Sequence, residues 1–401
     1  MTDHSAENNA IAQYIAYQLL ESKKLTNTCT SPVDVIEIMS KVLYAADAHC
    51  GLVQPPQKEY KTTPSGLSVT RTITSGKSEQ ILQGLIDDLD AIYIQGDNPL
   101  LTSIKLVREF RANWVHLFES IPIVFNYPEG PRETAGMILD ASTFDIPVHV
   151  GAVAIEFSLY FEGGMFVTFY YPNPGSTLPL QNIKDIISDE KKAMQLVREN
   201  YQKSCGDLEN IAYKIDAEIK KVKPSHNWWD GRPFEMPGYK PENEAIGLLY
   251  SEYITIKESL KQQHLPEMTF LGELTMPTFT MSCETDILNS EEFISSPLYE
   301  KFMGADSRVK EYIGKLINMY NKTTVTLNEL GGYAHSETGA DFMDRGCCDD
   351  EPEKKLIKVK IDRDFRFEIN SYSYDREIVT HFAGKVMEPI PAPVSASASI
   401  P

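Results

Sequence analysis

Apolar residues recur every three or four positions along much of the chain, a spacing that predicts amphipathic helices. One helix is expected to begin at Ser31, whose hydroxyl can cap the first backbone amides, with Pro32 suited to the first turn. The spacing predicts helices over residues 5–24, 31–43, 78–94, 98–118, 180–201, 207–223, 241–263, 290–302 and 307–320.

A different pattern occupies two neighbouring stretches, 153–161 and 165–171, where apolar and polar positions alternate. Gly163 and Gly164 lie between them and suit a tight turn, so we expect a β-hairpin here. Further strands are expected at residues 67–74 and 359–369. Because helices outnumber strands and do not alternate regularly with them, the pattern predicts an α+β fold that is predominantly helical with interspersed β-hairpins.

The same pattern predicts three segments along the chain. They are a mainly helical segment over 1–140 with a Pro/Thr-rich loop at 51–76, a mixed segment over 141–385 with the hairpin at 150–171 and several helices, and a flexible Pro/Ala/Ser tail over 386–401. The tail has too few apolar side chains to form a core of its own.

Composition narrows the classes of function. The 401 residues include 38 Lys and Arg against 57 Asp and Glu, a formal charge of −19, which disfavours nucleic-acid binding through a broad basic face. Six cysteines without any Cys-x-x-Cys spacing disfavour zinc fingers and a disulfide scaffold. The apolar runs are shorter than the about 20 residues that a membrane helix needs. We therefore expect a soluble protein of a reducing compartment, with no membrane partner and no cofactor.

Gly76-Lys77-Ser78 is the strongest candidate for phosphate binding, because glycine amides and a lysine cradle phosphates at a helix start. The full motif needs a glycine five positions earlier, where Arg71 stands. An ordinary helix cap by Ser78 explains the same residues.

His335 and Glu337, followed by Cys347-Cys348, share residue types with the zinc site of nucleobase deaminases. In that site two residues separate the cysteines so that both thiolates reach one metal, whereas here they are adjacent. The acidic run over 341–351 lacks the spacing of a calcium loop. A solvated acidic loop is the favoured interpretation.

His226 and Asp230 are four residues apart and could form a general base, but no nucleophile has a recognisable setting nearby. Trp228 and Trp229 between them, with Phe234, either pack in a core, which is the favoured interpretation, or act as interface anchors for a partner. The chain has neither a Gly-x-Ser-x-Gly nor a His-Glu-x-x-His motif. We therefore predict a protein that is not an enzyme, with no catalytic, cofactor-binding or metal-binding residues.

In size, helix-rich makeup with hairpin insertions, polar N-terminal segment and lack of catalytic motifs, the chain resembles the coat proteins of partitiviruses, the small double-stranded RNA viruses of plants and fungi. The resemblance implies a structural capsid subunit that self-assembles, with homodimers building an icosahedral shell. It further implies an enclosed RNA genome and viral polymerase as partners, and a location in the virion and the host cytoplasm.

Two alternatives remain open. One is a soluble pathogen enzyme or effector with an unrecognised acidic/His site, either in the loop 226–234 or in the segment 335–351. The other is a monomeric binding module that neither assembles nor turns over a substrate.

Overall fold

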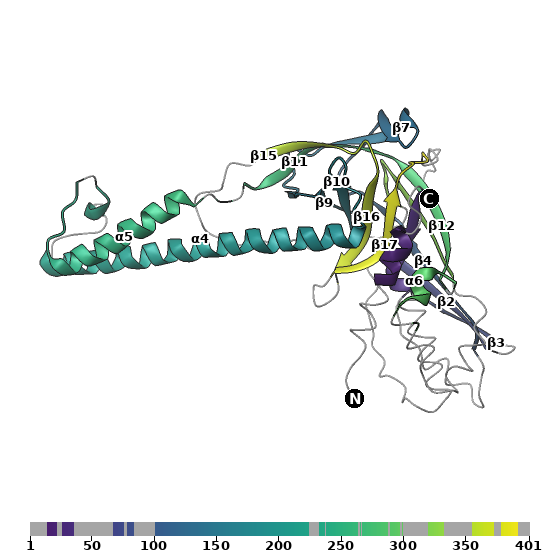
Figure 1. Cartoon of the computed structure of the whole chain (residues 1–401), viewed down its shortest axis with the longest axis horizontal. Coiled ribbons are helices and arrows are strands. Elements are labelled where there is room, and N and C mark those ends of the chain that lie inside the picture. The colour runs from purple at the N-terminus through teal and green to yellow at the C-terminus, as the bar shows by residue number, and fades with distance from the viewer. Residues whose placement is uncertain are drawn as a thin grey trace, which may run out of the picture. The chain divides into compact units, whose positions relative to one another are not determined.

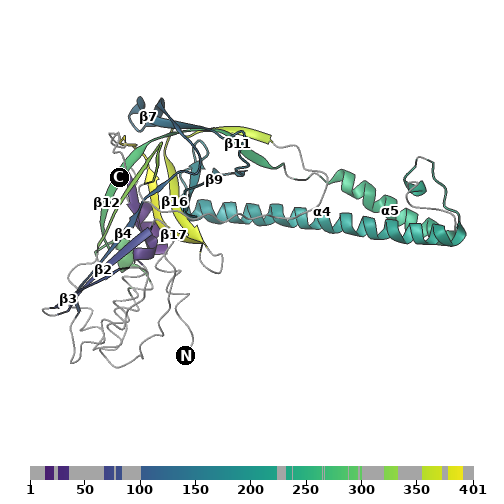
Figure 2. The same ribbon diagram turned by 180° about the vertical axis from the view of Figure 1, so that it is seen from behind.

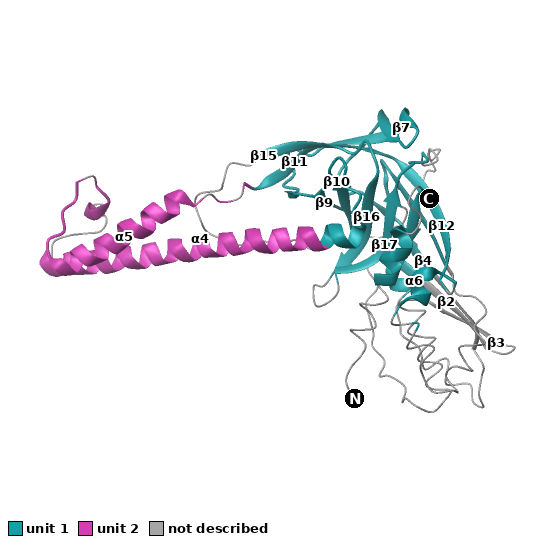
Figure 3. Ribbon diagram, in the orientation of Figure 1, with its two compact units in different colours: residues 1–184, 268–401 teal, residues 185–267 magenta. Residues whose placement is uncertain are grey.

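The computed structural model describes most, but not all, of the chain. It describes residues 14–21, 26–35, 67–75, 78–83, 101–223, 232–236, 238–263, 265, 267–287, 289–296, 299, 320–332, 355–372 and 378–391. Contacts between these residues divide the chain into two compact units, residues 1–184 with 268–401 and residues 185–267 (Figure 3).

Unit 1 consists mainly of β-sheets (Figure 1). The largest is a six-stranded antiparallel sheet with the order β1-β17-β16-β10-β9-β8. Its strands are β1 (Thr28–Thr30), β17 (Ile378–Val386), β16 (Phe365–Tyr372), β10 (Phe166–Pro172), β9 (Ala154–Tyr160) and β8 (Val148–Val150).

Three smaller sheets complete the described strands of this unit. The first is β15 (Lys355–Lys360), β11 (Thr269–Pro277), β7 (Gly130–Asp140) and β6 (Glu119–Tyr127), in which only β11 and β15 pair in parallel. The second is β12 (Phe279–Asp286), β13 (Tyr320–Asn328), β14 (Gly331–Gly332) and β5 (Ala112–Asn113). The third is β3 (Ser78–Gln83), β2 (Leu67–Ser75) and β4 (Leu101–Phe110).

Aromatic side chains form much of the core between these sheets. Phe169 packs near Phe157 and Phe365, and Phe279 of β12 packs on Phe365 and Phe367. All five are at most 2% exposed. Every residue of β10 is buried, so both faces of this central strand are covered. This explains why β10 is apolar almost throughout and does not alternate with charged residues.

The second face of the six-stranded sheet is covered by helical segments. The helix over residues 14–21 lies beside β16 and β17 in both views (Figure 2), and Tyr17 on it bonds Glu368 of β16. The backbone amide of Leu180, the first residue of α4 (Leu180–Val222), donates a hydrogen bond to Glu21, which lies on the helix over residues 14–21. A short helix, α6 (Glu291–Ile294), follows β12 and is capped by Ser290.

Unit 2 is a helical hairpin. The part of α4 after Lys184 packs against α5 (Glu244–Gln262), and the short 3₁₀ helix η2 (Pro233–Glu235) precedes α5. Their shared core contains Ile211, Ala212, Ile215, Ile219, Phe234, Ile246 and Tyr253. Asn243 caps α5 by accepting the Ile246 amide at 2.8 Å.

The predominantly helical prediction is wrong, because sheets form most of unit 1. The predicted helix over 78–94 begins as strand β3, and the one over 98–118 contains strands β4 and β5. β2 pairs with β3 on one side and with β4 on the other, so hydrogen bonds between distant segments decide these conformations. The proline-containing stretch 122–131 belongs to the β6–β7 hairpin.

Several predicted elements are confirmed. β9 and β10 form the expected hairpin, with Gly163 and Gly164 both at positive φ between them. The predicted strand at 67–74 is β2, and the predicted helix over 241–263 contains α5. The two helices predicted over 180–201 and 207–223 are one continuous helix, α4, which tolerates Gly206 in its interior.

The predicted three-segment division remains a prediction. Its boundary at residues 140/141 lies inside unit 1, at the end of β7. Residues 386–391 of the predicted tail are described, and Ile390 forms a β-bridge with Thr280. Residues 392–401 and most of the loop at 51–76 lie outside the described residues. The same holds for the predicted helix over 307–320, apart from its last residue. Gly76 and Lys77 of the phosphate-loop candidate also lie outside the described residues.

Candidate functional site

A buried group of polar side chains, the Ser31 cluster, joins the helical turn at 32–35 to strands β4, β13, β16 and β17 of unit 1. It consists of Ser31, Asp34, Arg108, Asn321, Ser371 and His381, all at most 8% exposed. Ser31 begins the helical turn at 32–35 as expected, and its amide is 3.4 Å from Asn321 Oδ1 of β13. Its hydroxyl donates to the backbone carbonyl of His381 in β17 at 2.7 Å.

Arg108 brings β4 into the same cluster. Its Nε lies 2.6 Å from Asp34 Oδ1, and this ion pair is almost entirely removed from solvent. Its Nη1 lies 3.4 Å from Nδ1 of His381, whose Nε2 is 2.8 Å from the Ser371 hydroxyl. The pairing of β16 with β17 skips His381, so a β-bulge directs this residue into the cluster.

A serine, a histidine, an arginine and an aspartate in one chain of contacts raise the question of catalysis. The Arg108 guanidinium can only donate hydrogen bonds, so Nδ1 of His381 accepts and Nε2 carries the proton. Burial, with Arg108 beside it, lowers the pKa of His381 to about 3. The nitrogen that faces Ser371 is therefore already protonated and cannot take the serine proton, so this geometry does not make a nucleophile.

The Ser31 cluster instead supports two strand edges. β4 pairs with β2 on one side, and β13 pairs with β12 along its whole length. On its other side β13 pairs, among the residues that the structure describes, only through Leu327 and Asn328 with β14. The stretch 321–326 therefore has an edge without a described strand partner, and Asn321 at its start bonds Ser31.

β13 and the end of β4 meet at a tight junction. β14 pairs with β13 on one side and with β5, which directly follows β4, on the other. Gly331 has φ +144°, and a Cβ on it would lie 2.2 Å from the carbonyl oxygen of Ala112. Trp114 then donates from Nε1 to the carbonyl of Asn328 at 2.7 Å. Only glycine permits this close approach of the strands.

The carbonyl of Asn328 therefore points toward the side of β13 where Trp114 lies. Because backbone groups alternate along a strand, those of Thr326, Thr324 and Lys322 point to that same side. The backbone groups of the residues between them are directed to β12. The edge of β13 thus presents hydrogen-bonding groups in the pattern that pairs with an additional strand.

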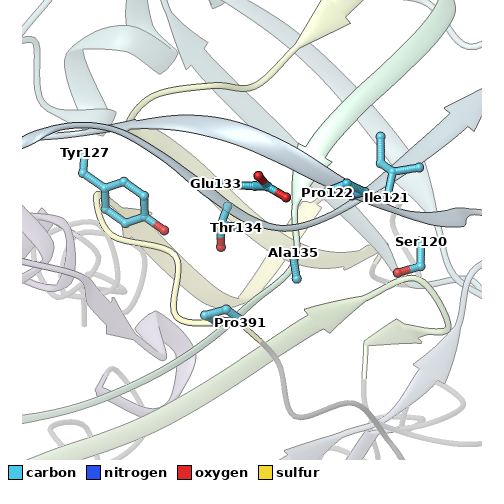
Figure 4. A pocket seen from close by; sticks show the side chains of 8 residues that line it. All are labelled: Ser120, Ile121, Pro122, Tyr127, Glu133, Thr134, Ala135 and Pro391. Atoms are coloured by element: carbon cyan, nitrogen blue, oxygen red, sulfur yellow. The ribbon is translucent and has the colours of Figure 1, made fainter.

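A shallow pocket of about 670 Å³ lies at the β6–β7 hairpin (Figure 4). Tyr127, Thr134 and Pro391 line it, together with Ser120, Ile121, Pro122, Glu133 and Ala135. It is wide open to solvent, and the Tyr127 hydroxyl already donates to the Pro389 carbonyl at 3.2 Å. It is a weaker candidate than the strand edge, because an enclosed ligand site buries most of its ligand.

Most of the sequence-predicted candidates lie outside the described residues. These include Trp228, Trp229, His226, Asp230, His335, Glu337, Cys347 and Cys348. Phe234 is described, is 1% exposed and packs edge-on against Tyr253, so it contributes to the core of unit 2. A partner contact by the two tryptophans stays a prediction.

Arg108, Asp34 and Ser371 were not among the residues that the sequence pattern indicated. β4 contains three charged residues, Lys105, Arg108 and Glu109, and the sequence alone does not mark Arg108 as a buried one. Within the described ranges, no group of three His, Cys, Asp or Glu side chains could hold a metal. Helices long and apolar enough to span a membrane are also lacking in the part of the chain that the structure describes.

Comparisons with known proteins identify no family from sequence. No protein-family model matches the chain, and no curated protein matches it. Similar solved structures are serpins. The thermophilic serpin tengpin is 13% identical with a TM-score of 0.45, over 97% of this chain and 95% of that one. Human kallistatin is 14% identical with a TM-score of 0.46, over 96% and 97%. The mouse protein-Z dependent protease inhibitor is 11% identical with a TM-score of 0.44, over 96% and 98%.

At these identities and TM-scores the likeness assigns neither a family nor a function to this chain. No coat protein is among the structures named here, and the helix-rich makeup on which the partitivirus resemblance depended is not observed.

The capsid prediction is therefore wrong. Its consequences fall with it: the self-assembling shell, the enclosed RNA and polymerase, and the virion location. The alternative of a pathogen enzyme or effector has no support in the comparisons either.

Proposed function

We propose that this chain is a non-catalytic protein-binding protein that takes up an extended peptide segment as an added β-strand along the edge of β13. The observation that carries the proposal is the stretch 321–326 of β13, which pairs with β12 on one side and with no described strand on the other. An unpaired strand edge is a template for pairing with another chain.

The two faces of β13 fit a bound strand. Thr323 and Val325 are at most 5% exposed and face the core, whereas Lys322 and Thr324 are exposed on the opposite face. An added strand would continue this division, with small or apolar side chains toward the core and polar ones toward solvent. The partner segment is therefore expected to alternate between apolar and polar residues.

Buried hydrogen bonds hold both ends of this edge in place. Asn321 is bonded to Ser31 at one end, and Asn328 is bonded to Trp114 at the other. A preorganised edge loses little conformational entropy when a strand is added, so backbone hydrogen bonds contribute more of their energy to binding. Side chains at alternate positions then supply specificity.

The test is an array of overlapping twelve-residue peptides that includes this chain's own residues 333–344, followed by calorimetry with the peptides that bind. Thr324→Pro removes an amide that points to the open side of β13 without removing a bond to β12. Thr324→Val keeps the amide and is the matched control. We expect Thr324→Pro to weaken binding at least tenfold and Thr324→Val to change it less than threefold.

Amide hydrogen exchange provides a second measurement on the unaltered protein. Peptide binding should slow exchange at Lys322, Thr324 and Thr326 and leave the intervening amides, which β12 already protects, unchanged. Binding that persists in Thr324→Pro, protection that appears elsewhere, or an array without any binding peptide would each contradict the proposal.

A further inference from the structure

Two thiols from distant parts of the sequence lie in contact in unit 1. Cys29 is on β1 of the six-stranded sheet, and Cys283 is on β12 of the sheet that contains β13. The backbone amide of Cys29 donates to Cys283 Sγ at 3.2 Å. No disulfide joins them in this structure.

The surroundings hold both sulfurs at this contact. Cys29 Sγ lies 3.2 Å from the Thr323 carbonyl, and Cys283 Sγ lies 3.3 Å from the Asn27 carbonyl. Three antiparallel backbone pairs between β1 and β17 hold Cys29 in place. Cys283 is held opposite Thr323 in the ladder between β12 and β13. The two sulfurs are thus positioned by strands and not by mobile side chains alone.

The two cysteines differ in access. Cys29 is 1% exposed, whereas Cys283 is partly exposed. The neighbouring Cys283 side chain, together with burial, raises the pKa of Cys29, so Cys29 is the poorer first nucleophile. An external reagent would therefore react first at Cys283.

We propose that Cys29 and Cys283 are a modification site, a thiol pair that small-molecule disulfides of the glutathione type convert to an internal cystine. In the first step the Cys283 thiolate attacks one sulfur of the reagent. A mixed disulfide forms, the reagent's S–S bond breaks, and one small thiolate leaves and takes up a proton from water.

In the second step Cys29 loses its proton to solvent and attacks the Cys283 sulfur. The Cys29–Cys283 bond forms, the bond to the reagent breaks, and the second small thiol is released. Two protein thiols are thereby oxidised, and one small disulfide is reduced to two thiols. The reverse reaction with excess small thiol restores the structure described here.

The cystine would connect β1 to β12 across 253 intervening residues of the chain. A cross-link over so long a loop restricts the conformations of the unfolded chain and thereby stabilises the folded state. We expect oxidation to raise the thermal unfolding midpoint by about 5–10 °C. A second expectation rests on the proposed function: the cystine should hold the β12–β13 pair in place and reduce peptide uptake at least threefold.

The experiment treats the full-length reduced protein with oxidised glutathione, stops the reaction with acid and maps the peptides by mass spectrometry. We expect a Cys29–Cys283 cross-linked peptide to appear and to disappear again with excess reduced glutathione. In Cys29→Ser the reaction should stop at a glutathione adduct on Cys283, and Cys283→Ser should leave Cys29 unmodified. Cys205→Ser, which changes a described cysteine on α4, is the matched control and should form the cystine as the unaltered protein does.

The proposal is overturned if the unaltered protein accumulates only glutathione adducts, if Cys29 or Cys283 pairs with another cysteine, or if neither reacts. Failure of peptide uptake with an intact cross-link reaction would contradict the proposed function alone. The cross-link is read from peptide masses and does not depend on any partner.

Discussion

Two buried polar clusters lie on opposite faces of β16, and they stabilise their buried charged groups in different ways. The Ser31 cluster includes Ser371, and the second, the Glu368 cluster, consists of Tyr17, Tyr170, Lys184 and Glu368. In the Glu368 cluster one carboxylate accepts from Lys184 Nζ at 2.7 Å, from Tyr170 at 3.1 Å and from Tyr17. In the Ser31 cluster an ion pair holds an imidazole that stays neutral.

The difference is visible in the pKa values. Burial and the nearby Glu368 raise the pKa of Tyr17 to about 12, so the phenol remains a donor. Burial lowers the pKa of His381 to about 3, with the Arg108 charge acting in the same direction. Tyr17 therefore stays protonated from mild acid to neutral pH, whereas the Ser31 cluster holds its histidine in the neutral form.

Removing the Arg108 side chain should have the largest effect on stability. Arg108→Leu leaves the Asp34 carboxylate buried without its cation, and we expect unfolding free energy to fall by about 3–5 kcal/mol. Equilibrium urea unfolding measures the change. The double variant Arg108→Leu/Asp34→Leu should recover part of the loss, and a single-variant loss below about 1 kcal/mol would contradict a buried ion pair.

The second largest effect is expected from acid, which should lower the stability of the folded protein through His381 of the Ser31 cluster. The unfolded chain protonates His381 near its ordinary pKa of 6.5, but the folded protein does so only near 3. Between these values the unfolded state binds more protons, so this contribution to stability is lost as pH falls. From pH 6.5 to pH 4.5 the loss from this residue is about 2–3 kcal/mol.

His381→Gln isolates that contribution, because glutamine can accept from Arg108 and donate to Ser371 without titrating. Urea unfolding across this pH range should show a shallower dependence in the variant than in the unaltered protein. Identical slopes would mean that His381 does not titrate as its surroundings require.

Glu368→Gln tests the second cluster at nearly constant side-chain size. Lys184 loses its charged partner, and we expect a loss of about 2 kcal/mol in unfolding free energy. The pKa of Tyr17 should fall, which titration by ultraviolet absorbance measures. Glu388→Gln, at an exposed position, is the control, and an unchanged tyrosine titration in Glu368→Gln would refute the assigned contact.

The smallest effect is expected in unit 2. Lys192 and Asp189 form an ion pair on α4 with side chains 74% and 79% exposed. Solvent screens such a pair, so Lys192→Ala should change stability by less than about 0.5 kcal/mol in urea unfolding. A loss comparable to that of Arg108→Leu would show that burial is not what distinguishes these ion pairs.

Helices and strands were predictable from the sequence only where several local features within the same short stretch agree. The hairpin of β9 and β10 was predictable because alternation, flanking aromatics and two glycines agree within one short stretch. The helix α5 was predictable for the same reason, from its periodic apolar residues. The strands β3 and β4 were not, because their apolar residues have helix-like spacing and it is the pairing of each with β2 that makes them strands.

The candidate site could be anticipated only in part. Ser31 followed by Pro32 correctly indicated the start of a helical turn. That this serine bonds β17 and β13 depends on segments about 290 to 350 residues away. The contact of Cys29 with Cys283 likewise has no counterpart in the spacing of the cysteines.

The sequence by itself determined the local elements with strong periodicity, the acidic charge of −19 and the lack of a recognisable catalytic motif. The tertiary structure decided the sheet-rich fold, the neutral state of His381 and the edge of β13 that has no strand partner among the described residues. The physical reason is that strand pairing and burial are properties of residues that are distant along the chain. A strand edge or a perturbed pKa exists only after folding has selected the neighbours.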